Sequence, residues 1–186
     1  PSEHPEPVAE RRTTSVLFAD LVGFTTMSET RDPEETREFL TRYFTTCRTV
    51  LARYGGTVEK FIGDAVMAVW GVPVSREDDA ERAVRAGIDL VAAVAALGAD
   101  GEGDVAVRVG VVTGEVAVTL GAQGEGMVAG DAVNTAARVQ SAAGRGEVWV
   151  DEATRALTAA AITFADAGTH ELKGKAVPLE LFRAVR

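Results

Sequence analysis

The spacing of apolar residues in the first third of the chain predicts a strand followed by an amphipathic helix. The short run from Thr13 to Ala19 is apolar and rich in β-formers, and it ends at Asp20. Apolar residues then recur at three and four residue steps from Phe39 to Tyr54. This run follows the helix-start signal Asp32-Pro33 and stops at Gly55-Gly56. We expect this helix to pack one face on a sheet.

The next segment predicts a hairpin and a second long helix. The strand-like runs Thr57–Ile62 and Ala65–Trp70 are joined only by Gly63-Asp64, which is the length and residue type of a tight turn. Asp64 is therefore expected at an exposed hairpin tip. The periodic apolar positions from Ala80 to Val94 predict a helix that ends near Gly98.

The last part of the chain predicts several short strands and two helices. Two strand-like runs, Val105–Val112 and Val116–Leu120, are expected to form another hairpin. The glycine-rich segment Gly121–Gly130 that follows them is expected to be a mobile loop. Asp131 is expected to cap a helix that reaches about Ala143. The remaining expected elements are a short helix near Glu152–Leu157 and strands at Val148–Val150, Thr163–Ala165, Glu171–Leu172 and Leu179–Ala184. This order predicts an α+β fold, a mixed β-sheet with helices packed largely on one face.

Composition narrows the class of protein. With 186 residues, 46% of them hydrophobic and 25% charged, the chain can bury one substantial core. Acidic residues outnumber basic ones by 28 to 19, and the net charge of −9 argues against general nucleic-acid binding. No apolar stretch approaches the ~20 residues that a bilayer span needs, so no membrane contact is expected. A single cysteine excludes a disulfide framework and fits a reducing, cytoplasmic compartment.

The chain start predicts a linker. Residues 1–12 combine prolines and charges without periodicity, so we expect an N-terminal extension there and one domain over residues 13–186. The chain begins at Pro1 rather than Met, as expected of a piece of a longer protein with regulatory domains attached.

Two aspartates offer candidate metal chemistry. Asp20 ends a strand and Asp64 lies at a hairpin tip, so the two carboxylates could meet at one sheet edge. Mg²⁺ and Mn²⁺ prefer such oxygen ligands and often share them with substrate phosphates. An aspartate in a Gly-Asp turn is also ordinary turn chemistry, and the spacing leaves both interpretations open. After Asp20, a glycine turn enters a helix at Gly23-Phe24-Thr25, where backbone N–H groups could bind a phosphate.

Three ordered motifs carry a family resemblance. They are the runs Phe18–Thr25 (FADLVGFT), Lys60–Ala68 (KFIGDAVMA) and Gly130–Arg138 (GDAVNTAAR). Together they resemble the class III nucleotidyl (adenylate/guanylate) cyclase catalytic domain, in its bacterial, actinobacterial-like form. The resemblance implies a ferredoxin-like βαββαβ core and an adenylate cyclase that converts ATP to 3′,5′-cyclic AMP and pyrophosphate.

The same resemblance implies the metal and catalytic residues. Asp20 and Asp64 would hold two Mg²⁺ or Mn²⁺ ions in each active site, with the Leu21 carbonyl as a further ligand. Asn134 and Arg138 lie four apart on one helix face. They would orient the ribose and stabilise charge on the α-phosphoryl group, respectively.

Substrate contacts are implied at three further positions. Lys60 would read adenine, because an ammonium group donates to the N1 acceptor of that base. Lys173 in the run Leu172-Lys173-Gly174-Lys175 would hold the β and γ phosphates, with Lys175 as the alternative. Met127 stands where many adenylyl cyclases place Asp or Thr to accept a hydrogen bond from the adenine amino group. Because a thioether is a weak acceptor, Met127 puts the choice between ATP and GTP in doubt.

The resemblance also implies a partner. In the family the active site forms between two such domains, and this chain carries both sets of residues. We therefore expect a homodimer with composite active sites. Two alternatives stay open: a cyclase with relaxed ATP/GTP selectivity, and a degenerate nucleotide-binding or dimerisation module that regulates attached domains.

Overall fold

A computed structural model describes residues 9–98, 105–120 and 126–186 of the chain. The helices are α1 (Phe24–Thr30), α2 (Pro33–Arg53), α3 (Asp79–Leu97), α4 (Asp131–Ala142) and α5 (Glu152–Thr158). The strands are β1 (Ala9–Val22), β2 (Thr57–Ile62), β3 (Ala65–Trp70), β4 (Ala106–Leu120), β5 (Gly126–Ala129), β6 (Val148–Asp151), β7 (Phe164–His170) and β8 (Leu179–Ala184).

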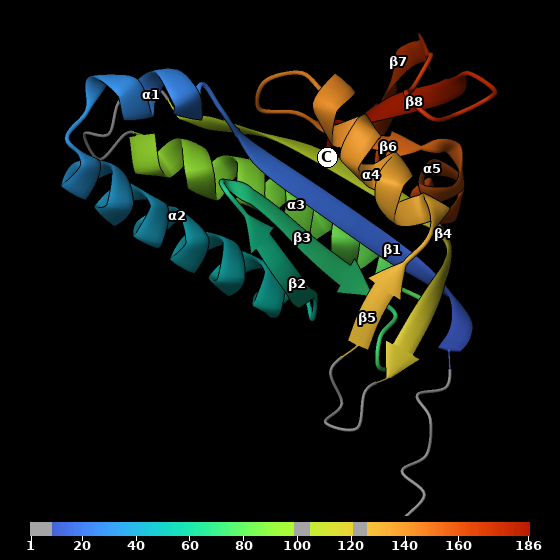
Figure 1. Cartoon of the computed structure of the whole chain (residues 1–186). Helices are drawn as coiled ribbons and strands as arrows, with labels where there is room; N and C mark the ends of the chain where they lie inside the picture. Colours follow the sequence, from blue (N-terminus) through green and yellow to red (C-terminus); the bar gives the residue numbers. More distant parts are fainter. Residues whose placement is uncertain (1–8, 99–104, 121–125) are drawn as a thin grey trace, which may run out of the picture.

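All strands belong to one mixed sheet. Its order is β2-β3-β1-β4-β6-β8-β7, and β5 pairs with β4 beside this path (Figure 1). The pairing of β4 with β6 is parallel, and the other pairings are antiparallel. β1 and β4 pair along their whole common length, from Ala9 opposite Thr119 to Val22 opposite Ala106. These two long strands form the spine on which the rest of the fold is arranged.

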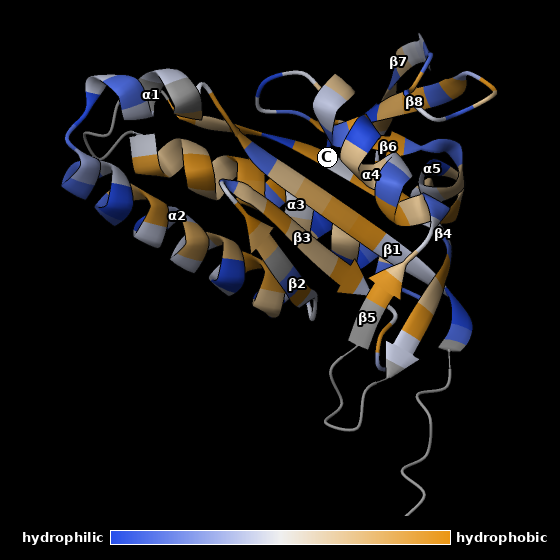
Figure 2. Ribbon diagram, in the orientation of Figure 1, coloured by the Kyte–Doolittle hydropathy of each residue, from blue (hydrophilic) through white to orange (hydrophobic). Residues whose placement is uncertain are grey.

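The two faces of the sheet are covered by different helices. Along β1, Leu17 and Ala19 join the core beneath α2 and α3, whereas Val16 and Phe18 join the core beneath α4. This division follows from the two-residue repeat of a strand. Figure 1 shows α4 across the sheet from the long helices α2 and α3. In Figure 2 the central strands are mostly hydrophobic, whereas α2 alternates between hydrophobic and hydrophilic residues, as an amphipathic helix requires.

A glycine allows α4 to approach the sheet closely. A Cβ added to Gly110 in β4 would lie 2.5 Å from the backbone nitrogen of Gln140 and 2.8 Å from the carbonyl oxygen of Ala136. Because both atoms belong to the α4 backbone, a side chain at position 110 has no room. Gly110 therefore fixes the height of α4 above the sheet.

Most predicted elements are confirmed. The strands Thr57–Ile62 and Ala65–Trp70 have the expected bounds, and α2, α3, α4 and α5 lie where their patterns predicted them. Asp32 caps α2 through a hydrogen bond from the Glu34 amide, at 3.0 Å. The element order also contains the expected βαββαβ core, with most helices on one face of a mixed sheet and α4 on the other.

The expected hairpin within residues 105–120 is wrong. A single strand, β4, runs from Ala106 to Leu120 without a turn. Pairing with β1 continues through Gly114, which lies opposite Thr14, so the long-range partner holds an extended backbone across the glycine. The hairpin partner of β4 is instead β5, within the segment expected to be a loop. The remainder of that expected mobile loop, residues 121–125, lies outside the described residues.

Smaller differences from the predicted elements occur elsewhere in the chain. β1 begins at Ala9, so the last four residues of the expected linker belong to the sheet, and residues 1–8 lie outside the described part. Asp131 is the first residue of α4 rather than its cap, a position that Gly130 occupies. Glu171–Leu172 is not a strand, because β7 ends at His170. None of the helices in the described part is long and apolar enough to span a bilayer.

Candidate active site

Two carboxylates meet at one end of β1. Asp20 is in β1, and Asp64 lies in the turn between β2 and β3. β1 pairs with β3 up to Ala19 opposite Val66, so the register carries Asp20 to the turn that holds Asp64. Burial, together with the hydrogen-bonding and repulsive proximity of Asp64, raises the pKa of Asp20 to about 7. The predicted meeting of these two residues is thus what the structure shows.

The donor set of this pair fits a hard divalent cation. The Oδ1 atom of Asp20 is buried and has no hydrogen-bond partner, which is costly unless a cation or water reaches it. Within the described ranges, no group of three or more His, Cys, Asp or Glu residues is placed to hold a metal ion. Mg²⁺ is usually bound by one or two carboxylates, and backbone carbonyls, water and phosphates fill its other coordination positions. The Asp20–Asp64 pair fits this pattern.

An arginine that the motif analysis did not select lies beside the pair. Arg108 in β4 is directly opposite Asp20 in the β1–β4 register. Its positive charge acts to lower the pKa of Asp20, but burial and the proximity of Asp64 have larger effects and raise it. Its Nε is buried without a hydrogen-bond partner. The sequence signal was available: Arg108 is a single cation inside the apolar strand run from Val105 to Val112. An unpaired guanidinium donor beside a metal-type site is suited to a phosphate oxygen.

Tyr43 and Cys47 of α2 lie near the carboxylates, whose charges act on the Tyr43 hydroxyl. Both side chains are fully buried, and the Tyr43 hydroxyl lies within hydrogen-bonding reach of the Cys47 thiol. Burial raises the pKa of the Cys47 thiol to about 12, so Cys47 is neutral and unreactive at physiological pH.

The α4 residues Asn134 and Arg138 are both exposed. They lie one helical turn apart and therefore share a face, and the opposite face is buried through Ala132, Ala136 and Val139. α4 stands on the same side of the sheet as Asp20, because Asp20 is two residues from Phe18 on the α4 face. Asn134 and Arg138 thus lie on the exposed face of a helix whose other face is packed on the sheet.

The remaining predicted substrate contacts lie in turns and edge strands. Gly23 has φ of 76° and precedes α1, so the expected glycine turn into a helix is present at Gly23, Phe24 and Thr25. Lys60 lies in β2 opposite Met67, and Met127 lies in β5 opposite Thr119. Lys173 is exposed in the loop between β7 and β8.

Within one chain, the predicted residues fall into two sets. Asp20, Asp64 and the added Arg108 converge at the end of β1. The hydrogen bonds and ion pairs observed in the described part of the chain do not connect this group with Asn134, Arg138 or Lys173. Within one chain, the candidate metal ligands Asp20 and Asp64 therefore lie together, whereas Asn134, Arg138 and Lys173 lie apart from them.

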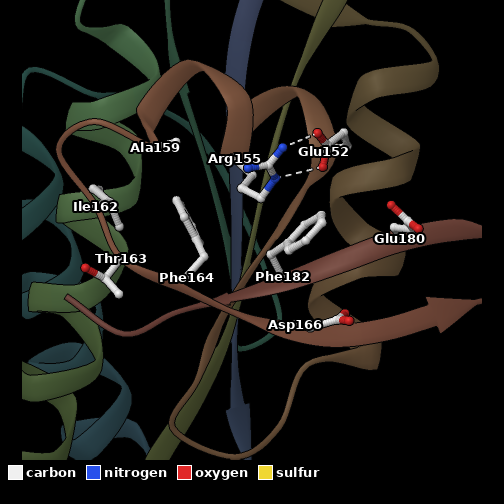
Figure 3. A pocket seen from close by; sticks show the side chains of 9 residues that line it. All are labelled: Glu152, Arg155, Ala159, Ile162, Thr163, Phe164, Asp166, Glu180 and Phe182. Carbon is white, nitrogen blue, oxygen red and sulfur yellow. Dashed lines mark hydrogen bonds and ion pairs between the residues drawn. The ribbon is translucent and has the colours of Figure 1, made fainter.

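A sizeable cavity lies away from both sets. About 570 Å³ in volume, it is formed by α5, β7 and β8 at the C-terminal side of the sheet (Figure 3). Its Arg155 is paired with Glu152 and lies 5.0 Å from the centre of the Phe182 ring. None of the residues predicted for catalysis lines it.

Comparison with known proteins extends the motif evidence to nearly the whole chain. The model of the adenylate and guanylate cyclase catalytic domain matches residues 7–182. The adenylyl cyclase CyaB from P. aeruginosa has a TM-score of 0.89 and 30% identity, with 96% of each chain covered. The guanylyl cyclase Cya2 has a TM-score of 0.84 and 30% identity, with 95% of this chain and 93% of that one covered.

Relatives known from sequence are longer. An adenylate cyclase of Mycobacterium tuberculosis (strain ATCC 25618 / H37Rv) is 32% identical over 166 residues, which are 88% of this chain and 37% of that protein. An uncharacterised protein of Rhizobium meliloti (strain 1021) is 34% identical over 180 residues, and the match spans only 18% of its length. The family model and the fold agree with the three motifs, and the chain belongs to the adenylate and guanylate cyclase catalytic domain family.

Proposed function

We propose that this chain is an adenylate cyclase catalytic domain that converts ATP to 3′,5′-cyclic AMP and pyrophosphate. The observation that carries the proposal is the Asp20–Asp64 pair, with its unsatisfied buried oxygen and the neighbouring guanidinium of Arg108. Similarity to an adenylyl cyclase structure and to mycobacterial adenylate cyclases supports this choice of reaction.

Asp20 and Asp64 would hold Mg²⁺ or Mn²⁺, with the Leu21 carbonyl as a further ligand. When bound, such ions lower the proton affinity of the ribose 3′-hydroxyl and offset the charge on the leaving pyrophosphate. The bond from O3′ to the α-phosphorus forms as the bond to the bridging oxygen breaks. The proton of the 3′-hydroxyl passes to solvent, and pyrophosphate leaves. The protein residues bind, orient and neutralise charge, and none of them becomes covalently attached.

Charge on the phosphates is met by three cationic residues. Arg138 would donate to the α-phosphoryl oxygens, where charge accumulates in the transition state. Arg108, which is held beside Asp20, would donate to a triphosphate oxygen. Lys173 would bind the β and γ phosphates. Asn134 would orient the ribose by hydrogen bonding, so that the 3′-oxygen lies in line with the leaving group.

We further propose that two chains form each active site. Asn134 and Arg138 are exposed and stand apart from the carboxylate pair, so a second chain related by a two-fold axis could bring its α4 to the carboxylates of the first. Such a dimer would contain two equivalent sites. Activity per milligram should therefore rise with protein concentration until dimerisation is complete.

Base selection is proposed to depend on Lys60, whose ammonium suits the N1 acceptor of adenine. Met127 supplies no strong acceptor for the adenine amino group, and one missing hydrogen bond is worth about 0.5–1.5 kcal/mol. We therefore expect ATP to be preferred over GTP, with the preference reduced several-fold relative to an enzyme that has an acceptor there.

The test is an assay of the purified chain with Mn²⁺, with ATP and GTP in parallel, over a range of protein concentrations. Cyclic AMP and pyrophosphate in equal amounts, formed faster than cyclic GMP, are expected. Faster formation of cyclic GMP would make the chain a guanylate cyclase. Nucleotide binding without any cyclic product would instead support the degenerate regulatory module. The double variant Asp20→Asn/Asp64→Asn is the inactive control.

A further inference from the structure

The loop that carries the candidate phosphate ligand Lys173 contains a tight turn with two anchors. The Lys175 amide donates to the Leu172 carbonyl oxygen at 3.0 Å, which closes a four-residue turn. Gly174 supplies the left-handed conformation at the third position of that turn, with φ of 85°. Leu172 is buried in the core cluster that also contains Val116 and Leu181, so the first residue of the turn is fixed to the sheet.

The second anchor is an ion pair to α4. The ammonium of Lys175 contacts the carboxylate of Asp131, the first residue of α4. A carboxylate in the first turn of a helix is favourable in its own right, because it faces the positive end of the helix dipole. The side chain of Lys175 is 23% exposed, so most of its surface is covered while it makes this contact.

The two lysines of the turn are therefore not equivalent. Lys175 is directed to the helix and its charge is already compensated. Lys173, which lies between the two anchors, is exposed, and no ion pair involves it among the residues that the structure describes. Both lysines line a hollow of about 450 Å³ that the loop encloses with Glu171 and Pro178.

We infer that Lys175 is a positioning residue that ties the turn carrying Lys173 to α4, the helix that carries Asn134 and Arg138, and that Lys173 alone of the two lysines binds the phosphates. This inference rests on the proposed cyclase function. The ion pair keeps the three substrate-binding side chains in one fixed arrangement before nucleotide arrives. Less conformational freedom then has to be lost on binding.

The kinetic test compares Lys175→Met, Asp131→Asn and the double variant. If the pair positions Lys173, each single variant raises KM for ATP by about two- to fivefold, the range that one partly exposed ion pair provides. The double variant is then no worse than either single one. The exchanged pair, Lys175→Asp with Asp131→Lys, recovers most of the loss. If Lys175 is itself the phosphate ligand, Lys175→Met is impaired while Asp131→Asn is not, and the inference is overturned.

Two controls sharpen the comparison. Arg85→Met removes an exposed ion pair with Glu81 on α3 and should leave KM and kcat unchanged. Lys173→Met should raise KM and the inhibition constant of pyrophosphate together, and adding Asp131→Asn to it should raise KM no further, because the ion pair acts through Lys173.

Hydrogen exchange of the substrate-free protein tests the contact without any assay of activity. Lys175→Met and Asp131→Asn should both accelerate exchange in the peptide that covers residues 171–178, whereas Arg85→Met should not. Unchanged exchange in both variants would refute the anchoring role even in an active enzyme. Faster exchange in a protein that forms no cyclic product would instead contradict the proposed function and leave the contact in place.

Discussion

The carboxylates of Asp20 and Asp64, which are far apart in the sequence, lie close enough to share a hydrogen bond when one of them is protonated. The β1–β3 register creates this relationship, because it ends where the β2–β3 turn begins. Burial of Asp20 disfavours its ionised form, and repulsion between the two acids when both are ionised adds to the cost. The stability of the substrate-free, metal-free protein should therefore depend on pH.

The stability of the metal-free protein should fall as the pH rises. The pKa of Asp20 is raised from 3.8 to about 7, so between these values the folded state binds more protons than the unfolded state. The stabilising contribution is complete below about pH 4 and is lost as the pH rises through about 7. Thermal unfolding in EDTA should show this decline, and Asp20→Asn should flatten it. An equal decline in the variant would assign the effect to other groups.

Mn²⁺ should reverse that loss in the wild-type chain. An ion that binds only the folded state stabilises it by about 2.7 kcal/mol at a concentration one hundred times its Kd. The melting temperature at pH 8 should therefore rise with added Mn²⁺ in the wild type and not in Asp20→Asn or Asp64→Asn. Glu81→Gln, which removes an acid from the exposed Arg85 pair, should respond like the wild type. Equal stabilisation of all four proteins would place the ion elsewhere.

Arg138→Ala should lower kcat by about 10² to 10³, the usual effect of losing one transition-state donor. Folding should not change, because Arg138 is exposed. Mixing Arg138→Ala chains with Asp20→Ala chains should restore activity, since a mixed dimer keeps one intact site. Activity that stays at the level of the separate variants would rule out a site shared between chains.

Gly110→Ala should destabilise the protein by about 1–3 kcal/mol, because the added methyl group meets the backbone of α4 at 2.5 Å. It should also reduce activity, since α4 carries Asn134 and Arg138. Gly114→Ala is the matched comparison. Its Cβ would meet only the Ala132 side chain, at 3.1 Å, and a smaller loss in urea unfolding is expected. Equal losses would show that α4 is not held by the contact at position 110.

Local sequence signals were sufficient for most of the fold. The residues that start and end α2, and the Gly63-Asp64 turn, act through neighbours in the chain, so their effect can be read from the sequence. β4 could not be predicted as one strand, because its continuity through Gly114 depends on pairing with β1, which lies near the start of the chain. β5 was missed for the same reason, since it is held by β4.

The candidate site was predictable to a similar extent. The motifs selected Asp20 and Asp64, and the register confirms that they meet. Arg108 is a single cation in an apolar strand run, but the sequence does not show that it lies opposite Asp20 on the neighbouring strand, which is a long-range relationship. The different surroundings of Lys173 and Lys175 likewise depend on a contact with Asp131, which the spacing of the two lysines does not reveal.

The buried Cys47 has a practical consequence for studying the turn. It is the single cysteine of the chain, it is fully buried, and its pKa of about 12 keeps it from reacting with maleimides at neutral pH. Thiol reagents should therefore not label the native protein at neutral pH. A cysteine introduced at the exposed Ala176 would take up a fluorophore or spin label selectively, and the signal would follow the loop as nucleotide binds.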